Sequence, residues 1–181
     1  MSRVSGRMGV MPLRYTTTPT PIGIALAVES DDGLVALRFA EASAESLLDQ
    51  IMAARREPAV RDDEALDPVA TQLEQYFTGE RRSFDIPLDL AGLTPFTRAA
   101  LGAIREIPYG ETAGYGEVAI TAGIPRAARA VGSVCANTPI SVVIPVHRVV
   151  RSDGSLGEYG GRPEVKRALL ALESGIEGVL P

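Results

Sequence analysis

The chain has 181 residues, of which 45% are hydrophobic, so it can form one large domain or two small ones around a packed core. The first 14 residues contain no apolar stretch of the length that a signal peptide needs, and no window of the chain has the length of a membrane span. We therefore expect a cytoplasmic protein that does not associate with membranes. With one cysteine, Cys135, and one histidine, His147, an intramolecular disulfide is excluded, and we expect neither a bound metal nor a cofactor.

The net charge of −5 is unevenly distributed. Residues 1–90 have 9 basic and 15 acidic side chains, whereas residues 91–181 have 9 basic and 8 acidic side chains, and Lys166 is the sole lysine of the second half. An arginine-rich half is compatible with a local phosphate-binding face. The charge distribution is equally compatible with an ordinary solvated surface that is rich in arginine.

The first part of the chain predicts a leader and a hairpin. Residues 1–14 are interpreted as a flexible leader, and residues 15–91 as an N-terminal α/β domain. Within this domain, residues 22–39 predict a β-hairpin, because alternating apolar residues flank the turn sequence Asp31-Asp32-Gly33.

Two helices and a further strand are expected in the rest of the first half. Residues 43–56 and 67–78 have apolar side chains at helical spacing, and the acidic segment between them is typical of a loop. Residues 83–90 alternate again and predict an edge strand, since Pro87 has no amide hydrogen to donate to a sheet.

The second half, residues 92–181, turns helical. Thr94 and Pro95 begin a predicted helix that runs to about residue 107. Residues 116–122 predict a short helix, residues 123–125 a turn, and residues 126–136 a second helix. This order is what a helix-turn-helix requires, although an ordinary corner between two helices has the same pattern.

The second helix of this pair has few long side chains. Its small residues are Ala127, Ala128, Ala130, Gly132 and Ser133, which leave Arg126 and Arg129 as its only long ones. Such a helix can pack tightly against a neighbouring helix. It can also enter a groove of DNA, where an arginine fills a space vacated in the base stack.

The stretch at 139–161 is the candidate chemical site. The apolar run PISVVIP predicts a buried strand that leads to Val146-His147-Arg148, and a polar turn at 151–155 then precedes Tyr159-Gly160-Gly161. The only histidine of the chain lies here. We expect any chemistry of this protein to occur in this stretch.

At IPVHRVV, with ARAVG before it and GEYGG after it, the chain resembles the O6-alkylguanine-DNA alkyltransferases. The resemblance runs from TPIG near residue 20 through QLEQYFTGERRSFDIPLDL to LLALE at 169–173, which is nearly the whole chain. It implies an α/β N-terminal domain, with a small antiparallel sheet and helices, and a mainly α C-terminal winged helix-turn-helix domain. The family binds the minor groove, flips the damaged guanine into a pocket, and transfers its alkyl group to the cysteine of Pro-Cys-His-Arg.

In this chain the corresponding tetrapeptide is Pro145-Val146-His147-Arg148. Transfer is a displacement at an alkyl carbon and needs a thiolate, which the histidine and a glutamate of the family set up. By resemblance these two positions are His147 and Glu173. Valine has no proton to lose and no lone pair, so we expect Val146 to be incapable of transfer and the relay to be a remnant.

The resemblance also implies residues that read the base and bind DNA. The base pocket would contain Tyr115, the carbonyls of Val146 and Val149, Tyr159, the amide of Gly160, and Gly161. On the DNA-binding face, Arg129 matches the arginine that fills the gap in the duplex. Its neighbours there would be Arg126, Ala127, Ala130, Gly132 and Thr138.

Four residues depart from the family pattern, lie beside the pocket or offer an alternative. Thr138 stands where the family has an asparagine, and Arg162 replaces the third glycine after Tyr159. Glu158 precedes that tyrosine, where an acid can repel phosphate or pair with Arg162. Cys135 lies eleven residues before Val146, has no second histidine to activate it, and is interpreted as a small buried apolar residue.

The interpretation we favour is a monomeric alkyltransferase-like protein that recognises O6-alkylguanine in double-stranded DNA without repairing it. It would then hand the lesion to nucleotide excision repair proteins. One alternative is an O6-alkylguanine-DNA alkyltransferase that is active through Cys135 or was deliberately inactivated at Val146. The other is a degenerate paralogue that binds DNA or proteins without preference for damage.

Overall fold

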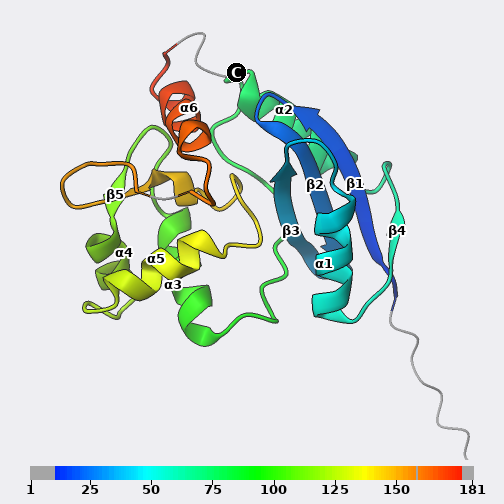
Figure 1. Ribbon diagram of the computed structural model, residues 1–181, viewed down its shortest axis with the longest axis horizontal. Coiled ribbons are helices and arrows are strands. Elements are labelled where there is room, and N and C mark those ends of the chain that lie inside the picture. Colours follow the sequence, from blue (N-terminus) through cyan, green and yellow to red (C-terminus); the bar gives the residue numbers. More distant parts are fainter. Residues whose placement is uncertain (1–10, 158, 177–181) are drawn as a thin grey trace, which may run out of the picture.

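The computed structural model describes residues 11–157 and 159–176. A sheet with two helices forms one side of the molecule, and a group of helices forms the other side (Figure 1). No helix in the described ranges is long and apolar enough to cross a membrane. Glu158 lies outside the described residues, and so does most of the predicted leader.

The N-terminal sheet has four strands in the order β3-β2-β1-β4. Their bounds are Leu13–Thr20 for β1, Gly23–Ser30 for β2, Gly33–Ala40 for β3 and Ala59–Arg61 for β4. The predicted hairpin is confirmed as β2 and β3, which pair antiparallel, as β1 does with β2. The sheet is mixed rather than antiparallel throughout, because β4 pairs parallel to β1.

Two of these strands were not predicted. β1 begins at Leu13, inside the segment expected to be a flexible leader, and Leu13 is buried and donates its amide to the Pro58 carbonyl. β4 lies in the segment expected to be a loop. The hydrophobic pattern does not indicate β1, because four of its residues are threonine and its two faces therefore differ little in hydrophobicity.

The predicted edge strand at 83–90 was wrong. The segment makes only one isolated bridge to the sheet, between Leu34 and Leu88. The Leu34 amide donates to the Pro87 carbonyl at 2.8 Å, and the Asp89 amide donates to the Leu34 carbonyl at 3.0 Å. Pro87 can accept but not donate, which restricts the pairing at this edge.

Two helices cover opposite faces of the sheet. Helix α1 (Glu45–Arg55) packs Leu47, Leu48 and Ile51 on a cluster that includes Leu26 and Val28. Helix α2 (Asp67–Phe77) buries the predicted stripe of Val69, Leu73, Tyr76 and Phe77 in the main core, which also contains Ala25 and Ala27. Alternate residues of β2 therefore serve the two helices, as the two-residue period of a strand requires.

The C-terminal part contains the predicted helix-turn-helix. The helices of the C-terminal part are α3 (Pro95–Arg105), α4 (Tyr115–Thr121), α5 (Ala128–Ala136) and α6 (Pro163–Glu173), of which α4 and α5 are the predicted pair. Strand β5 (Ala113–Gly114) pairs parallel with β6 (Val149–Val150). The predicted start of α3 is confirmed, since the Thr94 side chain accepts from the Thr97 amide at 3.1 Å. Helix α5 starts at Ala128 rather than 126, because the turn continues through a bond from the Ala127 amide to the Ile124 carbonyl.

The expected strand at 139–145 is instead a buried irregular segment. Its only pairings among the described residues are the isolated bridges Leu37–Ile140 and Ser141–Ile144. Val142 has a φ of 71°, a left-handed conformation that a β-branched residue rarely adopts and that interrupts an extended strand. The segment leads into a 3₁₀ turn, η1, at Val146–Arg148.

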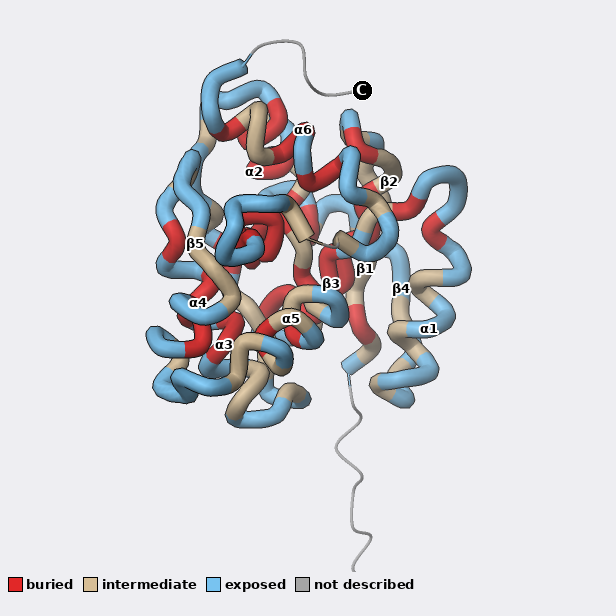
Figure 2. Tube along the Cα trace, turned by 60° about the vertical axis from the view of Figure 1, so that its left-hand side comes forward, coloured by how far each residue is buried: buried red, intermediate tan, exposed pale blue. Residues whose placement is uncertain are grey.

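One core continues between the two parts of the molecule. Tyr76 and Ile86 from the first half belong to the same buried cluster as Leu101, Val146 and Leu169 from the second half. The buried segments run through the centre of the chain trace (Figure 2). The candidate site at Val146 is therefore supported from both sides.

Gly33 provides a test of how tightly the sheet edge is built. It has a φ of 135°, and a Cβ atom there would lie 2.6 Å from the Pro87 carbonyl oxygen. We expect Gly33→Ala to lower the free energy of unfolding by more than about 1 kcal/mol, measured by urea denaturation. The control is Gly79→Ala, which also has a positive φ of 79° but meets nothing within 4 Å. Equal losses would show that the contact with Pro87 is unimportant.

Candidate functional site

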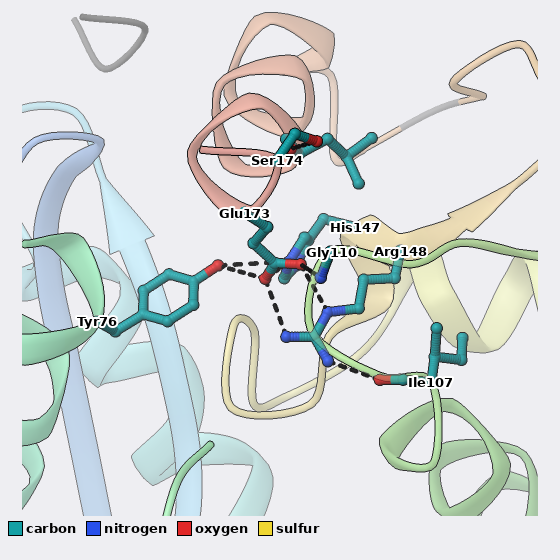
Figure 3. Close-up of polar contacts among 8 residues, drawn as sticks. Tyr76, Ile107, Gly110, His147, Arg148, Glu173 and Ser174 are labelled. Carbon is teal, nitrogen blue, oxygen red and sulfur yellow. Dashed lines mark hydrogen bonds and ion pairs between the residues drawn. The ribbon is translucent and has the colours of Figure 1, made fainter. Parts of the chain in front are cut away.

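A fully buried carboxylate, Glu173 at the end of α6, is the centre of the candidate site (Figure 3). Its Oε1 accepts from the Tyr76 hydroxyl at 2.7 Å and from Arg148 Nη2 at 2.9 Å, and it lies 2.8 Å from His147 Nε2. Its Oε2 accepts from Arg148 Nε at 2.8 Å and from the Gly110 amide at 3.2 Å. Three separate segments of the chain, α2, the loop at Gly110 and the turn at His147–Arg148, thus converge on this side chain.

The 3₁₀ turn presents His147 and Arg148 to this carboxylate. The turn is closed by a bond from the Arg148 amide to the Pro145 carbonyl and one from the Val149 amide to the Val146 carbonyl. Arg148 also donates through Nη1 to the Ile107 carbonyl at 2.7 Å. All three side chains of the turn are buried, which fixes their positions.

The protonation states follow from these contacts. Burial by itself raises the pKa of Glu173, but hydrogen bonds from His147 and Arg148 lower it to about 2, so the carboxylate is ionised. Burial lowers the pKa of His147 more than Glu173 raises it, and the imidazole is neutral at pH 7. Burial and the charge of Glu173 raise the pKa of Tyr76, which stays a hydroxyl donor.

A neutral imidazole that faces a carboxylate through Nε2 carries its proton on Nε2. Nδ1 is then a free base, and this buried atom has no hydrogen-bond partner in the described part of the chain. Val146, the preceding residue, is buried and hydrocarbon only. The arrangement is that of a positioned base beside a side chain with no proton to give.

Val146 is also one wall of a cavity of about 130 Å³. From the second half of the chain, Tyr159 and Gly160, which were expected in the base pocket, line the cavity together with Cys135, Thr138 and Arg162. From the first half, Ile22, Arg38 and Phe39 line it. The first-half residues were missed, because only the packing of the two halves brings them to Val146 and no local pattern marks them.

The other predicted base-pocket residues are placed outside the lining of this cavity. Tyr115, the first residue of α4, lies against Gly157, where a Cβ atom would come within 2.9 Å of the Tyr115 hydroxyl. The Val146 carbonyl accepts from the Val149 amide, and the Val149 carbonyl accepts from Lys166 Nζ at 2.6 Å. A carbonyl oxygen has two lone pairs and can accept more than one hydrogen bond.

The predicted DNA-binding residues gather around α5. Arg126 and Arg129 are exposed, whereas Ala127, Ala130, Gly132 and Thr138 are half-buried. Helix α5 packs on the core through Val131 and Val134. Arg129 is thus on the outer side of the helix, and its role in DNA binding stays a prediction.

Cys135 lines the same cavity as Val146, a proximity that their separation in sequence did not indicate. Burial raises the pKa of its thiol to about 11, so the thiol is protonated at neutral pH and weakly reactive. In the described ranges no group of three or more histidine, cysteine or acidic side chains is placed to hold a metal ion.

Two family models match the chain. The ribonuclease-like domain of 6-O-methylguanine DNA methyltransferase matches residues 13–90, and the DNA binding domain of the same family matches residues 95–175. A methylated-DNA–protein-cysteine methyltransferase of Mycolicibacterium paratuberculosis is 40% identical over 161 residues, covering 89% of this chain and 92% of the relative. One from Methanosarcina acetivorans is 36% identical and covers 88% of this chain and 97% of the relative.

Solved structures agree with this likeness. The O6-methylguanine methyltransferase of Mycobacterium tuberculosis is 38% identical, with a TM-score of 0.76 over 90% of this chain and 93% of that one. A structure from the same organism in complex with DNA has a TM-score of 0.77 at 38% identity, over 90% of this chain and 94% of that one. The predicted architecture of an α/β N-terminal domain and a helical C-terminal domain is confirmed.

Glu173→Gln tests the buried carboxylate. We expect the free energy of unfolding at pH 7 to fall by about 3 to 5 kcal/mol, because the Arg148 charge is left uncompensated. The pKa of Glu173 is lower in the folded state, so its contribution is present above about pH 4.5 and is lost as the pH falls toward about 2. Urea denaturation from pH 7 to pH 3 should therefore show a shallower acid dependence in the variant.

Glu164→Gln, an exposed change on the same helix, is the matched control and should follow the wild-type profile. If Glu173→Gln kept the wild-type acid dependence between pH 4.5 and 3, the assignment of that dependence to Glu173 would be wrong.

Proposed function

This chain belongs to the 6-O-methylguanine DNA methyltransferase family, and we propose that it binds duplex DNA containing O6-alkylguanine without accepting the alkyl group. The observation that carries the proposal is Val146, a buried hydrocarbon at the position where the resemblance places the family's cysteine. Attack on an alkyl carbon needs a lone pair, and valine has none. Transfer at this position is thereby excluded on chemical grounds.

The state of the relay supports loss of the nucleophile alone. Glu173 is ionised and fully paired, and His147 is neutral with a free Nδ1, which is the state a general base requires. His147 and Glu173, the groups that would activate a thiol, thus lie next to Val146, which cannot be activated. Binding functions that do not need the thiol are left intact.

DNA binding is supported by the match to the family's DNA binding domain and by the relative solved with DNA. In our proposal α5 enters the minor groove, and Arg129 fills the space left by the flipped nucleotide. Flipping costs a few kcal/mol and costs least for a damaged, poorly paired base. Preference for a lesion can therefore arise without any reaction.

The flipped guanine would be read mainly by backbone groups. The second lone pairs of the Val146 and Val149 carbonyls, the Gly160 amide and the Tyr115 hydroxyl are the proposed partners, with Tyr159 and Gly161 shaping the loop. Backbone readers do not depend on the side chain at 146. A bound, unrepaired lesion needs a further step, and nucleotide excision repair proteins are the proposed recipients.

A second candidate is alkyl transfer to Cys135, which is favoured by its place in the same cavity as Val146. Its raised pKa opposes this function, since a thiol that stays protonated is a poor nucleophile. The two candidates differ in whether the protein gains mass.

Lesion binding without transfer is tested by fluorescence anisotropy followed by intact mass spectrometry on the same samples. We expect tighter binding to a duplex with O6-methylguanine than to the matched guanine duplex, and no added methyl group at excess DNA. Arg129→Ala should reduce the affinity for the lesion at least about tenfold, the equivalent of 1.4 kcal/mol. Equal affinity for both duplexes refutes lesion recognition, and a methyl adduct on Cys135 supports the second candidate.

Val146→Cys tests whether the relay is competent. We expect this variant to accept one methyl group from O6-methylguanine DNA, because the next residue, His147, has a buried Nδ1 without a hydrogen-bond partner among the described residues and can act as the base for the new thiol. Intact mass spectrometry provides the readout, and Val146→Ala, a truncation without a thiol, is the control that should stay unmodified. A folded Val146→Cys variant that binds methylated DNA but gains no mass would show that the relay cannot activate a nucleophile here.

A further inference from the structure

Arg162 joins the loop at residues 159–161 to the N-terminal half. It is the residue before α6, and its Nη2 donates to the Ile22 carbonyl at 2.8 Å. Ile22 lies in the turn between β1 and β2 and is 2% exposed. Glu41, which follows β3, and Glu164 on α6 each lie 3.7 Å from Arg162 Nε. The guanidinium therefore connects the two halves of the chain.

The hydrogen bond to Ile22 is the strongest of these contacts. The carboxylates of the two ion pairs belong to side chains that are 79% and 63% exposed, so solvent screens both pairs. The bond to Ile22 is partly buried and has a charged donor, which places it in the stronger class of hydrogen bonds. Loss of this donor would also leave the carbonyl of a buried residue without its partner. We therefore expect the Arg162 side chain to be held mainly by Ile22.

The loop at residues 159–161 has little packing of its own. Gly160 and Gly161 are exposed, and a Cβ atom at either would meet nothing within 4 Å. The Arg162 amide closes the loop by donating to the Tyr159 carbonyl at 2.9 Å. Among the described residues 151–157 and 159–162, Arg162 is the one whose side chain makes a hydrogen bond or ion pair with the first half. The position of the loop relative to the N-terminal half thus depends on Arg162.

The same contact lies at the cavity beside Val146. Ile22, Arg162, Tyr159 and Gly160 all line this cavity. A movement of the loop away from Ile22 would displace the Gly160 amide, which is the proposed donor to the flipped guanine. A hydrogen bond weakens steeply when its distance and angle are lost, and a donor that is already in place binds more tightly than one that must first be ordered. Affinity for the base should therefore depend on where the loop is held.

We propose that Arg162 is a positioning residue that holds the 159–161 loop against the N-terminal half, where the Gly160 amide can read the flipped guanine. The proposal rests on the lesion-binding function proposed above. Arg162 acts through the loop and contacts neither the base nor the phosphates. It stands where the family pattern has a third glycine, which has no side chain to make the contact with Ile22.

The test separates positioning of the loop from a direct contact with DNA. Fluorescence anisotropy gives the dissociation constants of matched duplexes with guanine and with O6-methylguanine at several salt concentrations. The ratio of the guanine constant to the O6-methylguanine constant reports reading of the base, whereas the slope of log affinity against log salt concentration reports phosphate contacts. Backbone NMR order parameters of Gly160 and Gly161 in the free protein report the mobility of the loop.

We expect Arg162→Ala to lower the ratio about tenfold, because a hydrogen bond from a charged donor no longer holds the loop. The order parameters of Gly160 and Gly161 should fall, and the salt slope should equal that of the control variant. Arg162→Met keeps the apolar stem without the donor and should match Arg162→Ala, which excludes lost packing as the cause. Arg162→Lys keeps a charged donor and should retain most of the ratio.

Arg167→Ala is the matched control, because it removes the same charge from an exposed position of α6 outside the cavity. It should keep the wild-type ratio and order parameters. Thermal unfolding confirms that each variant is folded at the temperature of the assay.

Four results are decisive against these assignments. An unchanged ratio in Arg162→Ala, with a wild-type preference for O6-methylguanine, removes the positioning role and leaves lesion recognition standing. An equal loss of affinity for both duplexes, with a shallower salt slope than the control, assigns Arg162 to a phosphate contact. A lower ratio with unchanged order parameters excludes an effect through the loop. Equal wild-type binding of the two duplexes refutes lesion recognition itself.

Discussion

The buried carboxylate of Glu173 is the constraint on which the candidate site depends. An ion removed from water costs several kcal/mol unless it is paired and hydrogen-bonded. Here the compensation comes from Tyr76 on α2, the Gly110 amide, and His147 and Arg148 on the 3₁₀ turn. Each of these groups must keep its place for the chain to tolerate the charge. The geometry around Val146 is therefore maintained by folding requirements.

This coupling means that residue 146 can change while its surroundings keep their positions. Residue 146 supplies no hydrogen bond through its side chain, so an apolar residue there leaves every partner of Glu173 in position. Loss of His147 or Arg148 would instead leave buried groups unpaired. Within this structure residue 146 is the position of the 3₁₀ turn whose substitution disturbs the fold least.

Local pattern was sufficient for the helices and insufficient for the irregular chain. The stripe on α2 and the cap at Thr94 were readable because helical period and capping chemistry act over a few residues. The apolar run at 139–145 was mistaken for a strand, since a pattern of buried residues does not reveal the left-handed Val142. β1 was missed because its threonines blur the alternation between its faces.

The candidate site was likewise predicted only in part from the sequence. His147 and Glu173 were identified through resemblance, and the structure brings them within 2.8 Å of each other. Tyr76 was assigned to the core on its helical spacing, and its hydroxyl also donates to Glu173. Arg38 gave no signal, because it reaches the cavity through contacts between distant segments.

The N-terminal half is therefore part of the site rather than an appendage to the DNA-binding half. Its Tyr76 donates a hydrogen bond to Glu173, and its Ile22, Arg38 and Phe39 form one wall of the cavity. Without these residues the carboxylate would lose a hydrogen bond, and the cavity beside Val146 would open to solvent on that side. Hydrogen bonds and charges act most strongly where water is excluded. A protein that binds a ligand in this cavity thus has a physical reason to retain the N-terminal half.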